Sequence, residues 1–310
     1  MIRIRGDMYD IIVVGGGPAG MTAALYALRN GKSALVIEKN GFGGQMTNSP
    51  KIENFPGTEQ ISGNELADAM MDQILVQGAD IEISEVTGIR AEEHRKVVTT
   101  EDGEFEAKAV IIATGVKHRM LGLPGEDELV GEGISFCAVC DGDFYTDKVV
   151  CVAGGGNSAL QEAILLSDKC AKVIMLQDLP FFTGEQKLQD ILFARPNVET
   201  HVNKAITAMS HDANGLRGVE ITDRTSNIRK FVACDGLFVA IGLIPENEQF
   251  ENLADLDENG YFDSGEKCNT KTPGIFVAGD CRHKNIRQIT TAAADGTVAA
   301  LAACRYINGL

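Results

Sequence analysis

A glycine-rich turn between two apolar runs is the feature that most constrains the fold of this chain. The turn is Gly15-Gly16-Gly17-Pro18-Ala19-Gly20, a G-x-G-x-x-G segment. It follows the apolar run Tyr9 to Val14 and precedes a helical stretch from Met21 to Arg29. The next strand-like run, Ser33 to Glu38, ends in an acid 23 residues after Gly15. This order predicts a dinucleotide-binding fold, in which the helix N-terminus binds the pyrophosphate and the acid binds the ribose.

The same pattern recurs in the second half of the chain. Gly154-Gly155-Gly156-Asn157-Ser158-Ala159 is a G-x-G-x-x-A turn after the strand-like run Lys148 to Ala153. A helical stretch from Leu160 to Ser167 and a strand-like run from Lys172 to Leu176 follow it. Further strands are expected at 109–115, 236–242 and 274–280, and a small-residue helix at 288–306. The chain is therefore predicted to be α/β, with two Rossmann-like (three-layer ββα) dinucleotide-binding domains.

Composition excludes several other classes. The 310 residues are 44% hydrophobic, which is enough for a core and argues against disorder. The net charge of −16, without a run of Lys or Arg, argues against nucleic acid as a partner. Ile11 to Leu28 is uncharged, but its glycines and proline would break a membrane-spanning helix. Met1 to Asp10 has no long apolar stretch, so we expect no export signal and a cytoplasmic protein.

Two of the eight cysteines form the segment Cys137-Ala138-Val139-Cys140, and the other six stand alone. In a cytoplasmic chain a C-x-x-C pair indicates redox chemistry or a metal. Zinc sites usually have four ligands, and the chain has no second C-x-x-C pair, so no metal site is predicted. Buried inert thiols are the plain alternative. The favoured interpretation is a redox dithiol, because two thiols at this spacing close a small ring and carry two electrons as a disulfide.

These motifs, together with several shorter ones, resemble one family over essentially the whole chain. The shorter ones are Gly43-Gly44-Gln45, Glu53-Asn54-Phe55-Pro56-Gly57, Ala113-Thr114-Gly115, Cys140-Asp141-Gly142, and Gly279-Asp280 with Arg287-Gln288. Taken in order, they make the chain resemble the low-molecular-weight thioredoxin reductases, a family of flavoprotein disulfide reductases. The resemblance implies FAD. Its expected contacts are Gly15, Gly17, Pro18, Ala19, Gly20, Glu38, Lys39, Gly44, Gln45, Asn54, Ala113, Thr114, Gly115, Gly279, Asp280, Arg287, Gln288 and Ile289.

The resemblance also implies an architecture. Residues 1–117 and 246–310 would form a discontinuous FAD-binding domain. Residues 118–245 would form an inserted domain that carries the dithiol and the second, NAD(P)-like fold. The family is homodimeric, and its two domains rotate relative to each other. Lys117-His118-Arg119 and Leu243-Ile244-Pro245 are the expected hinges.

Roles for the dithiol follow from the same resemblance. Cys140 would face the flavin, and Cys137 would attack the disulfide of a thioredoxin, giving a mixed disulfide that Cys140 resolves. Asp141 matches the family's proton donor and acceptor, although an aspartate before Gly142 is also a common turn residue. Flavin oxidases and ferredoxin–NADP reductases on related scaffolds lack a C-x-x-C here. A reductase or oxidase of another disulfide partner, and a non-enzymatic flavoprotein, are the remaining alternatives.

The second fold departs from the NADPH-dependent members. They carry H-R-R-x-x-x-R where this chain has Gln177-Asp178-Leu179-Pro180-Phe181-Phe182-Thr183, so the arginine clamp for the 2′-phosphate is missing. A glutamate pair after the second glycine turn is also changed, to Gln161-Glu162. NAD(P)H is therefore a doubtful cofactor. Three electron donors stay open: NADH, with Asp178 on the ribose; NADPH at an atypical site; and a ferredoxin, as in the ferredoxin-dependent flavin thioredoxin reductases, which the chain most resembles.

A ferredoxin donor would impose a condition on this acidic chain. Ferredoxins are typically acidic, so docking requires a local basic patch. The expected members are Lys117, His118, Arg119, His283, Lys284 and Arg287.

Overall fold

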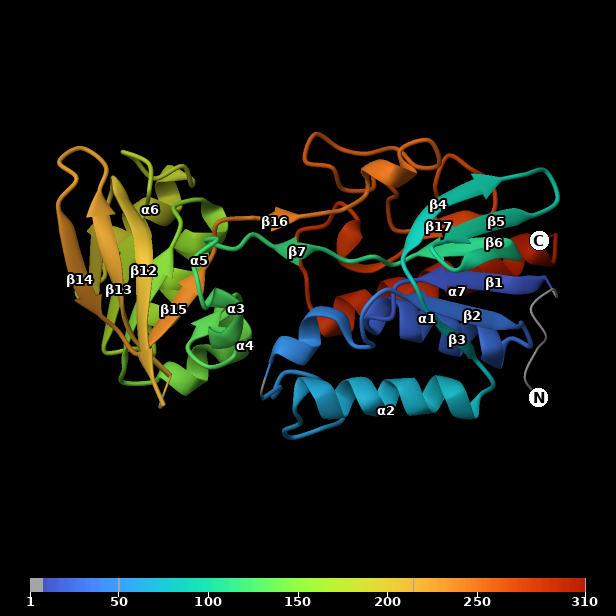
Figure 1. Ribbon diagram of the computed structural model, residues 1–310, viewed down its shortest axis with the longest axis horizontal. Coiled ribbons are helices and arrows are strands. Elements are labelled where there is room, and N and C mark those ends of the chain that lie inside the picture. Colours follow the sequence, from blue (N-terminus) through green and yellow to red (C-terminus); the bar gives the residue numbers. More distant parts are fainter. Residues whose placement is uncertain (1–7, 50, 214, 310) are drawn as a thin grey trace. The chain divides into compact units, whose positions relative to one another are not determined.

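The computed structural model describes residues 8–49, 51–213 and 215–309, and the chain divides into two compact units (Figure 1). Unit 1 runs to Lys117 and resumes at Ile244, and unit 2 is His118–Leu243. The two connections between them pass through short strands that pair with each other, β7 (Lys117–His118) and β16 (Leu243–Ile244). The first seven residues, on which the expectation about export partly rests, lie outside the described part.

Unit 1 is built on a seven-stranded sheet over its described residues. Strands β3, β2, β1 and β6 run parallel in that order, β17 pairs in parallel with the end of β6, and β5 and β4 continue from β6 as an antiparallel meander. The strands are β1 (Tyr9–Val14), β2 (Ala34–Glu38), β3 (Asp80–Ile83), β4 (Val86–Ala91), β5 (Lys96–Thr100), β6 (Gly103–Ile112) and β17 (Ile275–Val277).

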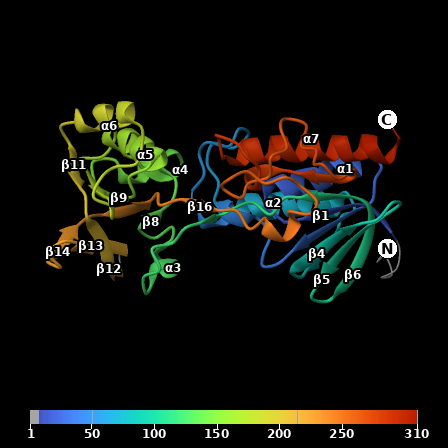
Figure 2. The same cartoon turned by 90° about the horizontal axis from the view of Figure 1, so that it is seen from above.

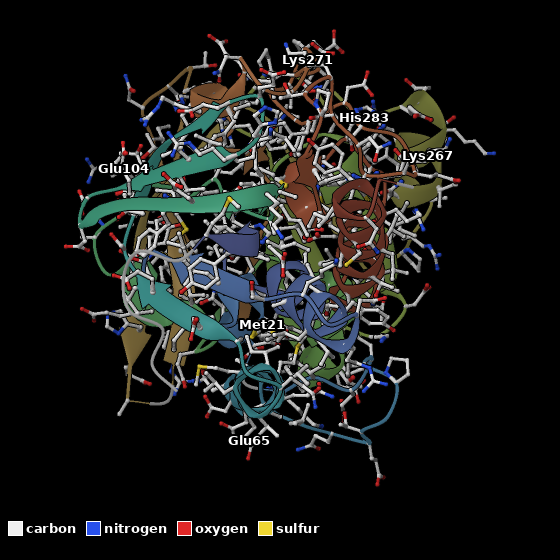
Figure 3. The ribbon with its side chains drawn as sticks, turned by 90° about the vertical axis from the view of Figure 1, so that its right-hand side faces the viewer. Met21, Glu65, Glu104, Lys267, Lys271 and His283 are labelled. Carbon is white, nitrogen blue, oxygen red and sulfur yellow. A yellow bond between two sulfur atoms is a disulfide. The ribbon has the colours of Figure 1, made fainter. Side chains whose placement is uncertain are left out.

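Helices cover one face of this sheet, and α1 and α7 lie side by side on it (Figure 2). The helices of unit 1 are α1 (Pro18–Arg29), α2 (Gly63–Val76), α7 (Ile289–Ile307) and the short 3-10 helices η1 (Gly44–Asn48), η3 (Glu248–Phe250) and η4 (Gly279–Cys281). Ile11 and Val13 pack toward the helices, and Ile12 and Val14 toward the meander and Phe250, because successive strand side chains point to opposite faces. Figure 3 views the unit from its end, with Met21 of α1 inside and Glu104 and Lys271 at the periphery.

Unit 2 repeats the three-layer plan. Its parallel sheet has the order β11-β10-β9-β15-β8, with helices packed on one face and the antiparallel sheet β12-β13-β14 on the other. The strands are β8 (Ile134–Ser135), β9 (Val149–Ala153), β10 (Lys172–Leu176), β11 (Val198–His201), β12 (Lys204–Asp212), β13 (Gly215–Asp223), β14 (Arg229–Ala233) and β15 (Gly236–Val239). The helices are α3 (Glu126–Leu129), α4 (Ala138–Asp141), η2 (Gly142–Tyr145), α5 (Asn157–Ser167) and α6 (Gln186–Phe193).

The predicted α/β class with two Rossmann-like folds is confirmed, and several predicted boundaries move. Helix α1 begins at Pro18 and not at Met21, because Gly17 is its N-cap and proline fits the first helical position. Helix α5 likewise begins at Asn157, directly after Gly156. Strand β6 begins earlier than expected, at Gly103, since its first half pairs with β5. In the described part of the chain, no helix is long and apolar enough to cross a membrane.

Candidate functional site

The first glycine turn stands where β1 ends and α1 begins, and two of its glycines are required by close packing. Gly15 has a φ of +110°, and a Cβ there would lie 2.3 Å from the carbonyl oxygen of Ala113. A Cβ on Gly20 would lie 1.9 Å from the carbonyl oxygen of Gly15. Nothing lies within 4 Å of the Cβ position of Gly17. The turn is therefore tight against its own sheet and open at the helix N-terminus, where an anion binds.

Glu38 closes the turn from the end of β2. Its carboxylate accepts hydrogen bonds from the backbone N–H of Gly16 at 2.7 Å and of Asn40 at 3.0 Å. The neighbouring Lys39 pairs with Glu246 at 3.3 Å and Glu85 at 3.6 Å, and its pKa is raised, since these two carboxylates outweigh the effect of burial. Glu38 thus shapes the turn, while Lys39 is held by carboxylates of the same unit.

Other segments that were expected to bind the cofactor gather around this turn. The N–H of Gly43 donates to the carbonyl of Gly16 at 2.9 Å, and the N–H of Ala113 donates to the carbonyl of Val14 at 2.8 Å. Gln45 Nε2 donates to the carbonyl of Val116 at 3.2 Å. Strands β1, β6 and β17 are parallel, so their carboxyl ends open at one edge of the sheet. Gly15, Ala113, Thr114, Gly115 and Gly279 all follow these ends.

Asp280 supplies the clearest sign of a ligand in unit 1. Its Oδ1 is buried and has no hydrogen-bond partner among the described residues. Burial raises the pKa of Asp280, while Lys284, 3.7 Å away, and Arg287 lower it. Buried oxygens are nearly always hydrogen-bonded, and Oδ1 has only the Lys284 ammonium at 3.7 Å, so it can accept a hydrogen bond from a ligand. The adjacent N–H of Gly279 donates to Asp295 Oδ2 at 3.1 Å, and this bond holds the turn.

The remaining predicted contacts lie before and at the start of α7. Arg287 stacks over the ring of Tyr261, 4.3 Å from its centroid, and its Nε is 3.5 Å from the carbonyl oxygen of Asp280. Gln288 is the N-cap of α7, and its Oε1 accepts from Asn54 Nδ2 at 3.2 Å. Ile289 is the first residue of the helix. Arg287 and Gln288 therefore join Asp280 and Asn54 in one region of unit 1.

The dithiol occupies a separate site in unit 2. Cys137 and Cys140 form a disulfide with their Cα atoms 5.3 Å apart, across the one-turn helix α4. The N–H of Cys140 donates to Cys137 Sγ at 3.2 Å. A donor aimed at sulfur stabilises a thiolate. The other six cysteines are buried free thiols, and burial raises the pKa of Cys170, Cys268 and Cys281 to about 11.

Ser135 is a residue of this site that the sequence analysis missed. It is buried at the end of β8, and its hydroxyl donates to Asp141 Oδ2 at 2.6 Å. The same Oγ accepts from the N–H of Cys137 at 3.1 Å. Ser135 thus ties the aspartate to the first cysteine. Its position two residues before Cys137 was visible, but nothing in the sequence indicated that its side chain turns toward Asp141.

The second glycine turn, at the end of β9, packs against the segment after β10, much as Gly16 of the first turn packs against Glu38 and Phe42. Gln177, which follows β10 as Glu38 follows β2, is buried and donates to the carbonyl of Phe181 at 3.1 Å. A Cβ on Gly155 would lie 2.5 Å from the side-chain amide nitrogen of Gln177. Gly155 also accepts from the N–H groups of Thr183 and Gly184, at 2.8 and 2.9 Å. The segment after β10 is therefore fastened onto the glycine turn.

Two carboxylates, Glu185 and Asp178, lie on the segment that follows β10. Glu185 accepts from Asn157 Nδ2 at 3.1 Å, and its own N–H donates to Asn157 Oδ1 at 2.7 Å, at the first residue of α5. Asp178 accepts two hydrogen bonds from Arg224, which lies between β13 and β14. Both carboxylates disfavour an approaching pyrophosphate or 2′-phosphate.

Several cations proposed for a basic patch are engaged within their own unit. Lys117 pairs with Glu246 at 2.7 Å, His283 with Asp257 at 2.5 Å and Lys284 with Asp295 at 2.9 Å. Burial lowers the pKa of His118 to about 4, so this imidazole is neutral at pH 7. These four residues do not supply the free positive charge that was expected of them.

Comparison with known proteins identifies the family. Residues 9–296 match the family described as pyridine nucleotide-disulphide oxidoreductase. The chain belongs to this family. It is 39% identical over 304 residues to the thioredoxin reductase of Bacillus subtilis, covering 98% of this chain and 96% of that protein. It is 38% identical to a 34.2 kDa protein in the rubredoxin operon of Clostridium pasteurianum, covering 97% of each.

A solved structure shows the same fold. Thioredoxin reductase from Streptococcus pyogenes superposes with a TM-score of 0.93 at 38% identity, over 98% of this chain and 99% of that one. Membership of the family implies FAD, and unit 1 fits it. The open helix N-terminus at Gly17 suits a diphosphate, and the orphaned Asp280 Oδ1 suits a hydroxyl donor.

Proposed function

We propose that the protein is an FAD-dependent thioredoxin reductase that takes its electrons from a ferredoxin. The Cys137–Cys140 disulfide, set beside Asp141 and Ser135, carries the first part of this proposal. The relatives named thioredoxin reductase support the substrate. FAD, held in unit 1, supplies the two-electron chemistry between a one-electron donor and the dithiol.

In unit 2 the residues divide the work of disulfide exchange. Cys137, whose sulfur receives the N–H of Cys140, attacks the thioredoxin disulfide. Cys140 resolves the mixed disulfide, so that the dithiol is oxidised and thioredoxin is reduced by two electrons. Asp141, held by Ser135, gives a proton to a leaving thiolate. Residues 1–117 with 246–310, and 118–245, remain the proposed FAD-binding and redox domains, and a homodimer in the cytoplasm remains the proposed state.

The side chains next to the second glycine turn support a protein donor over NADH or NADPH, although four of the six cations expected to dock it are paired or neutral within their own units. Gln177 donates its side-chain amide to the carbonyl of Phe181. Asp178 and Arg224 are hydrogen-bonded to each other, so neither side chain is available to bind the ribose 2′-group of a nicotinamide dinucleotide.

One anaerobic experiment tests the donor. The flavin of the purified holoenzyme is followed by absorbance while NADPH, NADH and reduced ferredoxin freed of its chemical reductant are offered separately. We expect reduced ferredoxin to bleach the flavin rapidly and both nicotinamides to do so at least a hundredfold more slowly. Rapid bleaching by NADPH or NADH would overturn the ferredoxin assignment. The substrate is tested separately, by the appearance of thioredoxin thiols after the reduced enzyme is mixed with oxidised thioredoxin.

A further inference from the structure

Glu162 is a half-buried residue with a buried carboxyl oxygen, Oε2, and the mechanism above does not use it. It lies on α5, which packs against α4, the helix of the dithiol. Three buried side-chain oxygens lack a hydrogen-bond partner among the described residues, and Glu162 Oε2 is one of them, with Ser84 Oγ and Asp280 Oδ1. The unpaired oxygen of Asp280 lies in the proposed cofactor region and so has a functional explanation. We therefore look for a functional explanation for Glu162 Oε2 as well.

The packing of α4 on α5 brings Asp141 near Glu162, because a Cβ on Gly142, the residue after Asp141, would lie 3.4 Å from Leu166 Cδ2, one helical turn after Glu162. Burial, and then the charge of Asp141, raise the pKa of Glu162 to about 8. Tyr145 lies on η2, and burial, followed by the charge of Asp141, raises its pKa to about 12. Among the other elements packed on α5, β10 brings Lys172, which pairs with Glu199, and α6 brings Lys187 and Asp190, which accepts from Gln186.

The two carboxyls differ in their hydrogen bonds. Asp141 Oδ2 receives the Ser135 hydroxyl at 2.6 Å, and such a donor stabilises a carboxylate. Glu162 Oε2 receives none. Two carboxyls whose surroundings differ in this way hold one proton between them, mainly on the less stabilised member.

We propose that Glu162 stores the proton that Asp141 delivers during disulfide exchange, so that the two carboxyls act as a pair. This inference rests on the proposed function and on the role of Asp141 in it. Glu162 acts through Asp141 and is a positioning residue in that sense. Its proton passes to Asp141 after Asp141 has protonated the leaving sulfur.

The proton balance of the reaction needs one proton besides that of Cys140, and the carboxyl pair supplies it. The attacking Cys137 is a thiolate, so the reduced site carries one proton on Cys140 and one on the carboxyl pair. Cys137 attacks, one substrate sulfur leaves as a thiolate, and the carboxyl pair protonates it. Cys140 then attacks the mixed disulfide, and its proton goes to the second leaving sulfur through Asp141. Two electrons and two protons pass to the substrate, and the Cys137–Cys140 disulfide forms.

The test compares two disulfides in single turnovers of the reduced holoenzyme between pH 6 and 9. Thioredoxin releases a basic alkyl thiolate that needs a proton, whereas 5,5′-dithiobis(2-nitrobenzoate) releases a weakly basic aryl thiolate that leaves without one. Glu162→Gln keeps the side-chain shape and removes the proton. We expect it to slow thioredoxin reduction at pH 7 by about tenfold to a hundredfold. As the pH rises, the rate of thioredoxin reduction should begin to fall at a lower pH in this variant than in wild type. The rate of the aryl disulfide reaction should change less than twofold.

Other outcomes count against the proposal. Equal slowing with both disulfides would mean that Glu162 only supports the local structure, and an unchanged pH profile with thioredoxin would overturn the proton store. Glu132→Gln, which removes an exposed charge of unit 2, is the matched control and should leave both reactions unchanged. The melting temperature of E162Q at pH 7 should not fall, because glutamine is neutral like the protonated glutamate.

An infrared titration tests the store independently of thioredoxin. A protonated carboxyl band that disappears as the pH rises through about 8 is expected in the wild type and not in E162Q. Absence of the band in wild type would overturn the inference. If wild type shows the band but does not reduce thioredoxin, the proposed substrate is wrong, while the inference that Glu162 holds a proton stands.

Discussion

Arg224 donates two hydrogen bonds to the carboxylate of Asp178, from Nε to Oδ1 at 2.5 Å and from Nη2 to Oδ2 at 2.8 Å. Asp178 is the second residue after β10. The family resemblance places an arginine at this position in the NADPH-dependent members. The fork of a guanidinium suits a phosphate as well as a carboxylate. In this chain the carboxylate already occupies that fork, and this pairing makes a 2′-phosphate a poor ligand.

Removal of that carboxylate should expose a phosphate site. Asp178→Asn leaves Arg224 with a neutral neighbour, and we expect adenosine 2′,5′-bisphosphate to bind with a Kd of about 1 mM, equivalent to roughly −4 kcal/mol. This ligand has no pyrophosphate, so its binding does not depend on the second glycine turn. Calorimetry checks the gain, with wild type expected to show no heat. The double variant Asp178→Asn/Arg224→Ala is the control, and binding by it would rule out Arg224 as the ligand.

The two cysteines should behave differently when each is replaced. Cys140→Ser retains the attacking Cys137 and lacks the resolving thiol, so we expect a mixed disulfide with thioredoxin to accumulate. Cys137→Ser should form little of it, because Cys140 does not receive the N–H bond that Cys137 Sγ receives. Both variants should lose steady-state turnover. Mass spectrometry under non-reducing conditions measures the adduct, and a larger yield from Cys137→Ser would reverse the assigned roles.

Ser135 should matter for both stability and chemistry. Ser135→Ala leaves the buried N–H of Cys137 without its acceptor and Asp141 without its donor. We expect the free energy of unfolding to fall by about 1–3 kcal/mol, and thioredoxin reduction to slow by about tenfold. Urea titration of the oxidised protein and single-turnover kinetics measure the two effects. Ser158→Ala, an exposed serine of the same unit, is the control and should change neither.

Asp280 should affect flavin binding and apoprotein stability in opposite directions. Burial raises the pKa of this carboxyl, so its ionised form is destabilising in the empty site at pH 7. Asp280→Asn removes that charge and weakens the acceptor offered to FAD. We therefore expect a higher melting temperature of the apoprotein and a lower ratio of flavin to protein absorbance after gel filtration. Asp263→Asn, which is exposed, serves as the control. Flavin retention equal to wild type would show that Asp280 does not hold the cofactor.

The parts of this structure that were predictable are those set by local chain order. Gly15 must be glycine because a Cβ there meets Ala113, and the run of apolar residues before it can only be a buried strand. Such constraints act within about thirty residues and leave a readable pattern. The antiparallel sheet β12-β13-β14 was not foreseen, because its edge strands are largely exposed and lack a clean alternation.

The site residues that escaped prediction depend on side-chain direction. Ser135 is one of many serines, and only the fold turns its hydroxyl toward Asp141. Arg224 is 46 residues from Asp178, and its pairing arises because the β13–β14 connection lies near the end of β10. Glu162 was noted for its place after the glycine turn, but its burial against the dithiol helix follows from how α4 packs on α5. No spacing rule reports contacts of this kind.

His118 should make the protein sensitive to acid. It stacks on Phe136 with ring centroids 4.4 Å apart, and burial lowers its pKa from 6.5 to about 4. The unfolded chain therefore binds more protons than the folded one between pH 4 and 6.5, so stability falls as the pH drops through that range. The loss from pH 7 to pH 5 amounts to about 2 kcal/mol from this residue. His118→Phe keeps the stacking and removes the titration, so urea unfolding at the two pH values should show a smaller loss than in wild type. His94→Phe, at an exposed position, should match wild type. An equal loss of stability in all three proteins would show that burial does not lower the pKa of His118.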